Sequence, residues 1–279
     1  QSEFGGAQRF LVNLLSKLDK SKYDILVLAG KDGDGEFMEY LKGKFNIKKL
    51  NYLRRAVSPL EDFLAIWEFR KKIKEFRPHI LFLCSSKAGF IGSWAARSFS
   101  DLKIIYRIGG WSFNDPNPWF LRRIYLWLEK LTAKYKDYII VNSMHDYGQA
   151  QKYSIIPRKR LELIYNGLDT YKLEFLSREE ARLKLAKFLP ELKNKFPEIL
   201  LVTIANFYKT KGLPILIQAL KIVEANYGSE NWAHVLIGGG PEKGSIESEI
   251  KRYGLEKKVL LAGRIPEAAK YLTAFDIFV

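Results

Sequence analysis

The sequence contains few of the side chains from which metal centres and disulfide frameworks are built. Its 279 residues include three histidines and a single cysteine, Cys84. This scarcity excludes a cysteine-rich zinc centre and a disulfide-stapled scaffold, and it suits a reducing compartment. The apolar runs are also shorter than the roughly 20 residues that a membrane-spanning helix needs. Cys84 ends one of these runs, and we expect it to be a small core residue.

The chain contains enough apolar residues for one large hydrophobic core or for two cores of ordinary size. Hydrophobic residues make up 47% of the sequence and aromatic residues 14%. The first residue is Gln1 rather than methionine, and the last two, Phe278 and Val279, have the pattern of a strand interior. We therefore expect the chain to be a fragment of a longer protein.

Positive charge is concentrated in the first half of the chain. Residues 1–165 hold 29 lysines and arginines against 17 acidic residues, a balance of +12, whereas residues 166–279 hold 17 against 14, a balance of +3. Such a basic half favours nucleic acid, an anionic membrane or a phosphorylated substrate as its partner. Because no recognised nucleic-acid motif accompanies the charge, we expect no nucleic-acid partner.

Short apolar runs alternate with helical patterns along the whole chain. This alternation predicts parallel sheets covered by helices on both faces, with ligands at the carboxyl ends of the strands. The scheme starts again after Asn166 to Asp169, which predicts two α/β units. The predicted strands are 24–29, 80–84, 104–108, 138–142, 161–164, 199–205, 233–237, 259–262 and a last one at Ile277. The predicted helices are 10–18, 60–76, one after Gly89, 119–133, 144–153, 178–189, 213–225, 245–253 and a short one from Pro266.

The stretch from Ile199 to Gly212 combines a buried strand with a loop that suits phosphate. The apolar run is followed by Asn206 and then by a loop with Lys209 and Lys211, which precedes a helical pattern. A helix N-terminus offers unpaired N–H groups and a partial positive charge, and Lys211 adds a full charge. The alternative is an ordinary strand–loop–helix connection with solvated lysines.

Two glycine clusters lie where the backbone could approach a ligand closely. Gly5 and Gly6 precede the first helix, and residues 238–241, with the sequence Gly-Gly-Gly-Pro, follow a predicted strand. Glycine permits a close approach because it has no Cβ. A plain loop explains the first cluster equally well. A tight turn explains the second, which lacks the spacing of a dinucleotide-binding fingerprint.

The loop from Gly109 to Pro116 is too rich in aromatic residues, glycine and proline to be a simple connection. It follows a predicted strand and contains Trp111, and we interpret it as a substrate-facing loop. The alternative is a hydrophobic plug over the edge of the sheet.

In their order and spacing, these motifs resemble the retaining, nucleotide-sugar-dependent glycosyltransferases of the GT-B fold known as glycosyltransferase family 4. The resemblance covers essentially the whole chain. Phe4 to Gln8 looks like the family's glycine loop, and Ile204 to Gly212 looks like its phosphate loop. The other matching segments are 141–143, 164–169, 237–241, 259–263 and 274–279.

The resemblance implies an α/β protein in which two Rossmann-like parallel-sheet domains face each other across a cleft. Residues 1–167 would form the N-terminal, acceptor-side domain without its first strand. Residues 168–279 would form the C-terminal domain that binds the nucleotide sugar, also incomplete.

The resemblance also implies roles for single residues. Lys211, with Asn206 nearby, would stabilise the departing diphosphate, because an oxocarbenium-like transition state pushes negative charge onto the phosphate. Gly5 and Gly6 would close over the same phosphates. The residues implied on the nucleotide side are Gly239, Gly240, Pro241, Gly263 and Arg264, and those implied for the substrate are Gly109, Gly110 and Trp111.

No cofactor or metal is implied beyond the nucleotide-diphosphate sugar, since a lysine and backbone N–H groups take the place of a cation. Asp32-Gly33-Asp34 does match the Asp-x-Asp motif that chelates a metal–nucleotide in one class of sugar transferases. Its flanking glycines indicate a solvated turn instead, so we predict no metal site there.

Three departures from the family's pattern concern the site. Asn206 stands where the family usually has an arginine, so stabilisation of the leaving group could be weaker or come from Lys209. Gly109 to Trp111 stand where many members have a histidine that faces the sugar. The pair of glutamates, eight residues apart, that follows the last strand in the family is absent, because this chain ends first. The ribose and sugar contacts therefore stay unassigned, and the chain could be inactive by itself.

These observations predict an enzyme that moves a sugar from a nucleotide-diphosphate donor to a glycan or lipid-linked acceptor in cell-surface polysaccharide biosynthesis. We expect it in the cytoplasm, with the basic first half peripherally attached to the inner face of the plasma membrane. A catalytically silent glycosyltransferase-like binding subunit is the alternative that Asn206 and Gly109 favour. A third class, a basic nucleic-acid-binding module, rests on charge alone.

Overall fold

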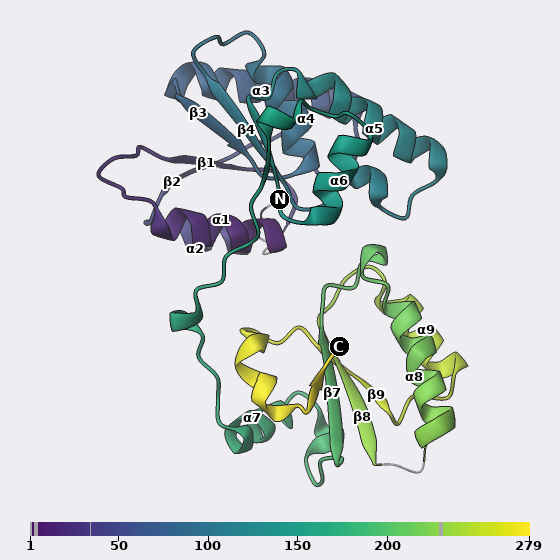
Figure 1. Cartoon of the computed structure of the whole chain (residues 1–279). Coiled ribbons are helices and arrows are strands. Elements are labelled where there is room, and N and C mark those ends of the chain that lie inside the picture. The colour runs from purple at the N-terminus through teal and green to yellow at the C-terminus, as the bar shows by residue number, and fades with distance from the viewer. Residues whose placement is uncertain (1, 3–4, 34, 229–230) are drawn as a thin grey trace. The chain divides into compact units, whose positions relative to one another are not determined.

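The computed structural model divides into two compact units, each an α/β fold with parallel strands (Figure 1). Unit 1 comprises residues 1–167 and unit 2 comprises residues 168–279. The structure describes residues 2, 5–33, 35–228 and 231–279. The parallel α/β architecture predicted from the sequence is confirmed, and it places the carboxyl ends of neighbouring strands at a common edge of each sheet.

Unit 1 contains one two-stranded and one four-stranded parallel sheet. The small sheet pairs β1 (Leu26–Ala29) with β2 (Asn46–Lys49), and the larger sheet has the order β3-β4-β5-β6. Its strands are β3 (Ile80–Leu83), β4 (Lys103–Ile108), β5 (Tyr138–Val141) and β6 (Leu161–Leu163). The helices are α1 (Gly6–Lys17), α2 (Glu36–Leu41), α3 (Pro59–Phe76), α4 (Ser86–Ala96), α5 (Trp119–Ala133) and α6 (Met144–Lys152).

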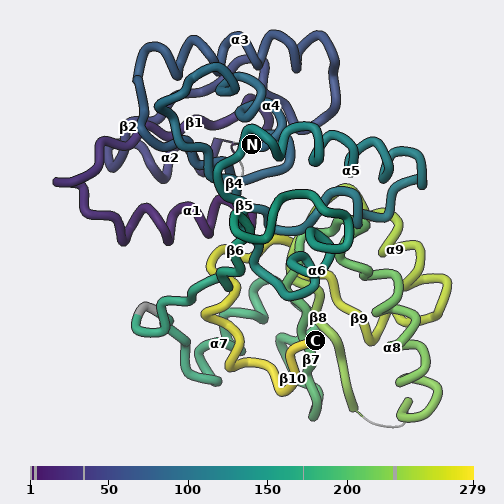
Figure 2. The backbone as a smooth tube through the Cα atoms, turned by 45° about the horizontal axis from the view of Figure 1, so that its top comes forward, coloured from purple at the N-terminus to yellow at the C-terminus, as the bar shows by residue number. Residues whose placement is uncertain are grey.

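Alternating side chains sort unit 1 into layers. In β1, Val27 and Ala29 are buried in a small cluster with Phe37 and Leu41, whereas Leu28 packs against the main core. Successive side chains of a strand point to opposite faces, so this short strand contributes to two cores. Figures 1 and 2 show α1 on one side of the strands and α3 with α4 on the other.

A buried polar cluster ties α5 to the middle of the larger sheet. The Tyr106 hydroxyl donates to one oxygen of Glu129 at 3.0 Å, and the Lys136 ammonium lies 3.2 Å from the other oxygen. Burial lowers the pKa of Lys136, and the charge of Glu129 opposes this shift. A Cβ on Gly89 of α4 would lie 2.5 Å from the Tyr106 ring. Tyr106 of β4 therefore contacts two helices closely, α4 through its ring and α5 through its hydroxyl.

Unit 2 has one four-stranded parallel sheet in the order β10-β7-β8-β9. Leu200 and Val202 of β7 pack with α7, whereas Leu201 packs with α8 and α9 on the other face. The strands are β7 (Ile199–Ile204), β8 (Trp232–Ile237), β9 (Val259–Gly263) and β10 (Ile277–Phe278). The helices are α7 (Arg178–Leu185), α8 (Leu213–Tyr227) and α9 (Lys243–Arg252), with the 3₁₀ segment η6 (Ala268–Ala274).

Four elements differ from the sequence-based expectation. The pattern does not predict α2 or β2, because β2 has no apolar run and only Ile47 among its side chains is half-buried. Helix α7 ends at Leu185 rather than at 189, and Pro190, which disfavours a helical conformation at residue 189, opens the 3₁₀ turn η4 (Pro190–Leu192). The helix expected from Pro266 is the 3₁₀ segment η6. The other predicted strands and helices are confirmed, with small shifts at their ends.

Candidate functional site

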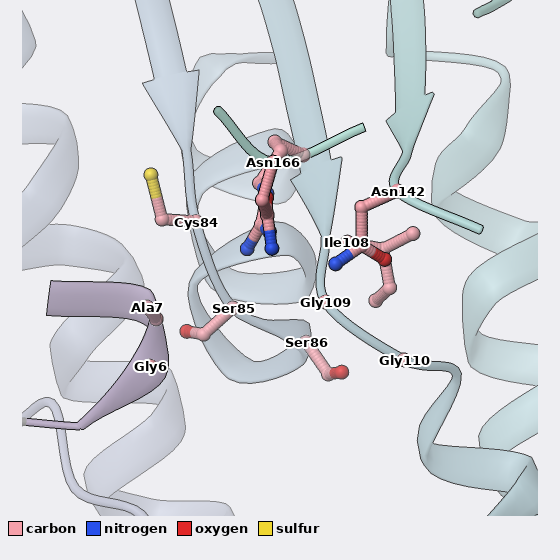
Figure 3. Close-up of a pocket in the computed structure, with 11 residues that line it drawn as sticks. Gly6, Ala7, Cys84, Ser85, Ser86, Ile108, Gly109, Gly110, Asn142 and Asn166 are labelled. Atoms are coloured by element: carbon pink, nitrogen blue, oxygen red, sulfur yellow. The ribbon is translucent and has the colours of Figure 1, made fainter. Parts of the chain in front are cut away.

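A pocket of about 310 Å³ opens in unit 1 at the carboxyl ends of β3, β4 and β5 (Figure 3). Ligands of open α/β sheets gather at this edge, where strands end and the following helices begin. As far as the structure describes the chain, the lining has no carboxylate. It consists of Gly6, Ala7, Cys84, Ser85, Ser86, Arg107, Ile108, Gly109, Gly110, Asn142 and Asn166.

Two helix N-termini reach this pocket. Helix α4 begins after Ser85, whose hydroxyl accepts a hydrogen bond from the Ala88 N–H at 3.2 Å. Helix α1 begins after Gly5. The first N–H groups of a helix have no intrahelical partner and carry a partial positive charge. Gly6 and Ser86, the first residues of the two helices, therefore bring positive potential to the pocket wall.

Arg107 supplies a full positive charge to the pocket. Its side chain extends from β4 and is only 4% exposed. The Nη2 donates to Asn166 Oδ1 at 2.7 Å, and the guanidinium carbon lies 4.1 Å from the centre of the Phe10 ring. The Nη1 lies against Gly109, where a Cβ would be 3.0 Å from that nitrogen. These contacts on three sides fix the guanidinium in place.

No acidic group balances Arg107 among the residues that the structure describes. Burial lowers the pKa of Arg107, and Cys84 opposes this shift. Burial in turn raises the pKa of the Cys84 thiol to about 12, against the effect of Arg107, so the thiol is neutral near pH 7. Arginine stays protonated in proteins, and the pocket therefore carries a net positive charge. Cys84 lines this pocket and is partly exposed, which corrects the expectation that it lies in the core.

Trp111 has almost no surface to offer a substrate. It is 1% exposed, its Nε1 donates to the Asp146 carbonyl at 2.9 Å, and its ring stacks on Phe113. The interpretation of Trp111 as a substrate contact is wrong, because the side chain is part of the core of unit 1. The plug interpretation fits this residue better. Gly109 and Gly110, just before it, do line the pocket.

In unit 2, the loops that follow β7, β8 and β9 meet at the carboxyl edge of the sheet. The Gly238 N–H donates to the Gly263 carbonyl at 2.8 Å, and the Phe207 N–H donates to the Gly239 carbonyl at 2.9 Å. Gly238 and Gly240 have φ values of +148° and +156°, and a Cβ would lie 1.9 Å and 2.7 Å, respectively, from carbonyl oxygens of the facing loop. Only glycine fits at these two positions.

The other residues predicted for the donor lie at the same edge of unit 2. A Cβ on Gly239 would be 3.4 Å from the Arg264 side chain, so these two residues are neighbours. Lys211 ends the 3₁₀ turn η5 (Lys209–Lys211), and Gly212, with a φ of +63°, is the N-cap of α8, which begins at Leu213. The side chains of Lys209 and Lys211 are exposed beside this helix N-terminus. The geometry therefore offers an exposed cationic and N–H-rich edge.

The structure thus gathers the predicted residues into one group in each unit. Gly6, Gly109 and Gly110 line the pocket of unit 1, and Gly5 lies one residue before it. The carboxyl edge of the sheet in unit 2 carries Asn206, Lys211, Gly239, Gly240, Pro241, Gly263 and Arg264, with Gly263 as the last residue of β9. Sequence reasoning missed Arg107 and the role of Asn166. The available signal was a charged residue inside the apolar run of β4, between two buried neighbours.

The Asp32-Gly33-Asp34 turn gives no sign of a metal site in its described part. Asp32 accepts a hydrogen bond from the Arg55 N–H at 2.7 Å, and Asp34 lies outside the described residues, as does Phe4 of the glycine loop. Within the described ranges, no three His, Cys, Asp or Glu side chains are grouped so that they could hold a metal ion.

Similarity to solved structures supports the same fold over the whole chain. The Anabaena protein Alr3699/HepE, solved in complex with UDP and glucose, matches with a TM-score of 0.75 at 19% identity, over 100% of this chain and 71% of that chain. The sucrose-phosphate synthase of Thermosynechococcus elongatus matches with a TM-score of 0.73 at 17% identity, over 99% of this chain and 70% of that chain.

Two bacterial relatives align with nearly the whole chain. One is the UDP-Gal:alpha-D-GlcNAc-diphosphoundecaprenol alpha-1,3-galactosyltransferase of Escherichia coli, 23% identical over 98% of this chain and 69% of that protein. The other is the lipopolysaccharide core biosynthesis glycosyltransferase LpsD of Rhizobium meliloti, 26% identical over 99% of this chain and 68% of that protein.

Two family models match successive parts of the chain. Residues 187–279 match the model described as Glycosyl transferases group 1, and residues 4–172 match the model described as Glycosyltransferase Family 4. With the parallel α/β units and the similar solved structures, these matches show that the chain has the GT-B fold and belongs to Glycosyltransferase Family 4.

Proposed function

We propose that the chain transfers a sugar, with retention of configuration, from a nucleotide-diphosphate donor to a glycan or lipid-linked acceptor in cell-surface polysaccharide biosynthesis. The observation that carries the proposal is the carboxyl edge of unit 2. There, Gly238 and Gly240 bring two loops into backbone contact, and Lys211 stands at the start of α8. Backbone that can approach closely, a helix N-terminus and a lysine are what a diphosphate requires.

In this proposal, Lys211 stabilises the leaving group. The bond between sugar and diphosphate breaks with oxocarbenium character, so negative charge develops on the phosphate oxygens and a nearby ammonium lowers the barrier. Asn206, at the end of β7, can donate hydrogen bonds but adds no charge. We propose that Lys211 and backbone N–H groups suffice without a metal ion or another cofactor.

The relatives suggest the substrates. The Escherichia coli relative is named for a UDP-galactose donor and a diphosphoundecaprenol-linked acceptor, and the Anabaena structure contains UDP. We propose a uridine diphosphate sugar as donor and a lipid-linked saccharide as acceptor. Unit 2 would bind the donor, and unit 1 would bind the acceptor.

The test is turnover of UDP-sugars by the purified protein, with Lys211→Ala compared with Lys209→Ala as a matched control in the same turn. We expect Lys211→Ala to lower kcat/KM at least about 100-fold, or roughly 2.7 kcal/mol, because a transition-state charge contact is lost. Lys209→Ala should change kcat/KM much less, and EDTA should not change it. Near-wild-type turnover by Lys211→Ala would contradict the assignment. UDP-sugar binding by the wild type without any turnover would instead support a catalytically silent binding subunit, which the uncharged Asn206 favours.

We also propose that unit 1 attaches peripherally to an anionic membrane, at the cytoplasmic face. None of the described helices is both long and apolar enough to cross a bilayer, so the attachment would be at the surface. Helices α3 and α5 both contact α4, and each exposes an apolar stripe followed by basic residues. The exposed apolar residues are Leu60, Phe63 and Trp67 on α3 and Trp119, Phe120, Ile124 and Trp127 on α5.

The basic residues extend the same stripes by helical spacing. Lys71 and Lys74 follow Trp67 on α3, and Lys130 and Lys134 follow Trp127 on α5, all of them exposed. Residues three or four apart lie on one face of a helix. Exposed tryptophans bordered by lysines suit the boundary between lipid headgroups and acyl chains, where the lysines meet anionic phosphates.

A further inference from the structure

We propose that the pocket of unit 1 is a receptor for a phosphate group of the acceptor, with Arg107 as its recognition residue. The proposal rests on the proposed function, which assigns the acceptor to unit 1. It extends that function by naming the chemical group that is recognised and the residue that recognises it.

The first argument is the unbalanced charge of Arg107. Arg107 is only 4% exposed, and it makes no ion pair with any residue that the structure describes. Its one hydrogen bond goes to the neutral amide oxygen of Asn166, and its cation–π partner is the uncharged Phe10. A buried charge without a counter-ion is costly, and a bound anion would remove that cost.

The second argument is the open edge of the guanidinium. Nη2 is occupied by Asn166, whereas Nη1 faces Gly109 and has no hydrogen-bond partner among the described residues. Any side chain at position 109 would place a Cβ 3.0 Å from Nη1. Gly109 does not have a positive φ, so backbone conformation does not require glycine at this position. What the absence of a side chain provides is space beside Nη1. That space is adjacent to the arginine donor.

The third argument is the composition of the remaining wall. Gly6 and Ser86 contribute the N-termini of α1 and α4, and Asn142 contributes an amide. Figure 3 shows Ser85 and Ser86 below Asn166, with Gly6 and Ala7 on one side and Gly110 on the other. A fixed cation flanked by N–H donors from two helices matches the several oxygens of a phosphate. A volume of about 310 Å³ leaves room for it.

Two substrates of this enzyme class could bring a phosphate, the lipid-linked acceptor and the nucleotide donor. A binding experiment separates them because it needs no turnover. Geranyl diphosphate serves as a probe for the acceptor's lipid diphosphate, and UDP serves as a probe for the donor. Both are titrated calorimetrically into the wild-type protein and into variants whose folding is checked by circular dichroism.

Three variants change the pocket in different ways. Arg107→Met removes the charge, and Gly109→Ala keeps the charge but obstructs Nη1. Asn166→Asp replaces the amide whose oxygen accepts from Nη2 by a carboxylate. Arg107 then has a counter-ion within the protein, and a bound anion should no longer be needed to balance its charge. Asn13→Asp, at an exposed site on α1 outside the pocket lining, is the matched control for the added negative charge.

We expect each of the three variants to weaken geranyl diphosphate binding at least about tenfold, as the loss of a charge-assisted hydrogen bond does. Asn166→Asp should do so without loss of thermal stability, which keeps the test valid if Arg107→Met fails to fold. Asn13→Asp should bind like the wild type, and UDP binding should be unchanged in all variants.

Unchanged geranyl diphosphate binding in Asn166→Asp and Gly109→Ala would overturn the proposal. Weaker UDP binding with intact geranyl diphosphate binding would also overturn it, since the pocket would then serve the donor. Failure of the proposed function has a different signature, namely no turnover of any UDP-sugar by the wild type, whatever the binding results.

Discussion

Arg107 and Trp111 lie four residues apart at the end of β4, and both are almost completely buried, yet their environments differ in kind. The indole N–H of Trp111 is satisfied by a backbone carbonyl and its ring is packed on Phe113. The guanidinium of Arg107 has no acidic partner among the described residues and borders a pocket. Burial alone therefore does not separate a core residue from a site residue. What separates them is whether every polar group of the buried side chain has a partner within the protein.

Replacing Trp111 by alanine should destabilise unit 1. Removal of a fully buried aromatic side chain typically costs about 3–5 kcal/mol, and the Asp146 carbonyl would lose its indole donor as well. Urea unfolding followed by circular dichroism measures this change. Trp119→Ala is the matched control, because Trp119 is 72% exposed and its removal should change stability by no more than about 0.5 kcal/mol. A stable Trp111→Ala protein with a raised KM for the acceptor would restore the substrate-contact interpretation.

The stripes on α3 and α5 make a prediction at the scale of the helix. We expect Lys130→Gln combined with Lys134→Gln to weaken binding to vesicles rich in phosphatidylglycerol by about 2 kcal/mol, or roughly thirtyfold, at about 1 kcal/mol for each basic residue. Trp119→Ser combined with Trp127→Ser should weaken it by loss of apolar contact. Co-sedimentation at low salt measures both effects.

The matched control for these helix variants lies in unit 2. Ile222 and Tyr227 of α8 are 64% and 60% exposed, but unit 2 has little net charge, so their replacement by serine should leave vesicle binding unchanged. Equal binding of the wild type to neutral and anionic vesicles, or binding that high salt does not reduce, would contradict membrane attachment through these stripes.

Strongly apolar elements could be predicted from the sequence, and weakly apolar ones could not. Strands such as β4 and β7 are revealed by runs of buried side chains, whereas β2 at a sheet edge has only Ile47 to mark it. The glycines at 109, 110, 239 and 240 were predictable for the same reason, since they follow such runs. Arg107 was not singled out, because its significance depends on Asn166, which is 59 positions away along the chain.

At the scale of the whole molecule, the two units have separate hydrophobic cores, and they should respond differently to acid. His234 of unit 2 is fully buried between β7 and β9, its Nε2 lies 3.0 Å from Thr203 Oγ1, and burial lowers its pKa to about 4. The unfolded chain, with an ordinary histidine pKa, takes up this proton at higher pH. Stability that is present above about pH 6.5 is therefore lost as the pH falls toward 4, and a shift of this size is worth about 3 kcal/mol.

One carboxyl group of unit 1, that of Asp115, has the opposite tendency in part of this range. Burial raises the pKa of Asp115, against the effect of Arg55, so the folded state binds that proton more readily than the unfolded chain and gains stability as the pH falls. Asp276 of unit 2 does not add to the effect of His234 above pH 4. Its burial raises its pKa, but hydrogen bonds from Arg178 and the Leu200 N–H outweigh this and hold the pKa below its usual value.

We therefore expect unit 2 to unfold before unit 1 when the protein is acidified from pH 7 to 4.5. Hydrogen exchange read separately for peptides of the two units measures this order. His234→Gln should flatten the pH dependence of unit 2 and leave that of unit 1 unchanged. The same slope in His234→Gln as in the wild type would show that another group governs acid stability.

The chain's single cysteine lies in the wall of the unit 1 pocket. A thiol-directed fluorophore or ¹⁹F tag therefore labels this chain only in the pocket wall, and no other thiol has to be removed first. The pKa of about 12 makes Cys84 a slow nucleophile at neutral pH, so labelling calls for alkaline solution and long exposure. An occupant that covers the wall would slow labelling further. This chain thus contains its own attachment point for a reporter of pocket occupancy, and a substrate library can be screened without introducing a cysteine.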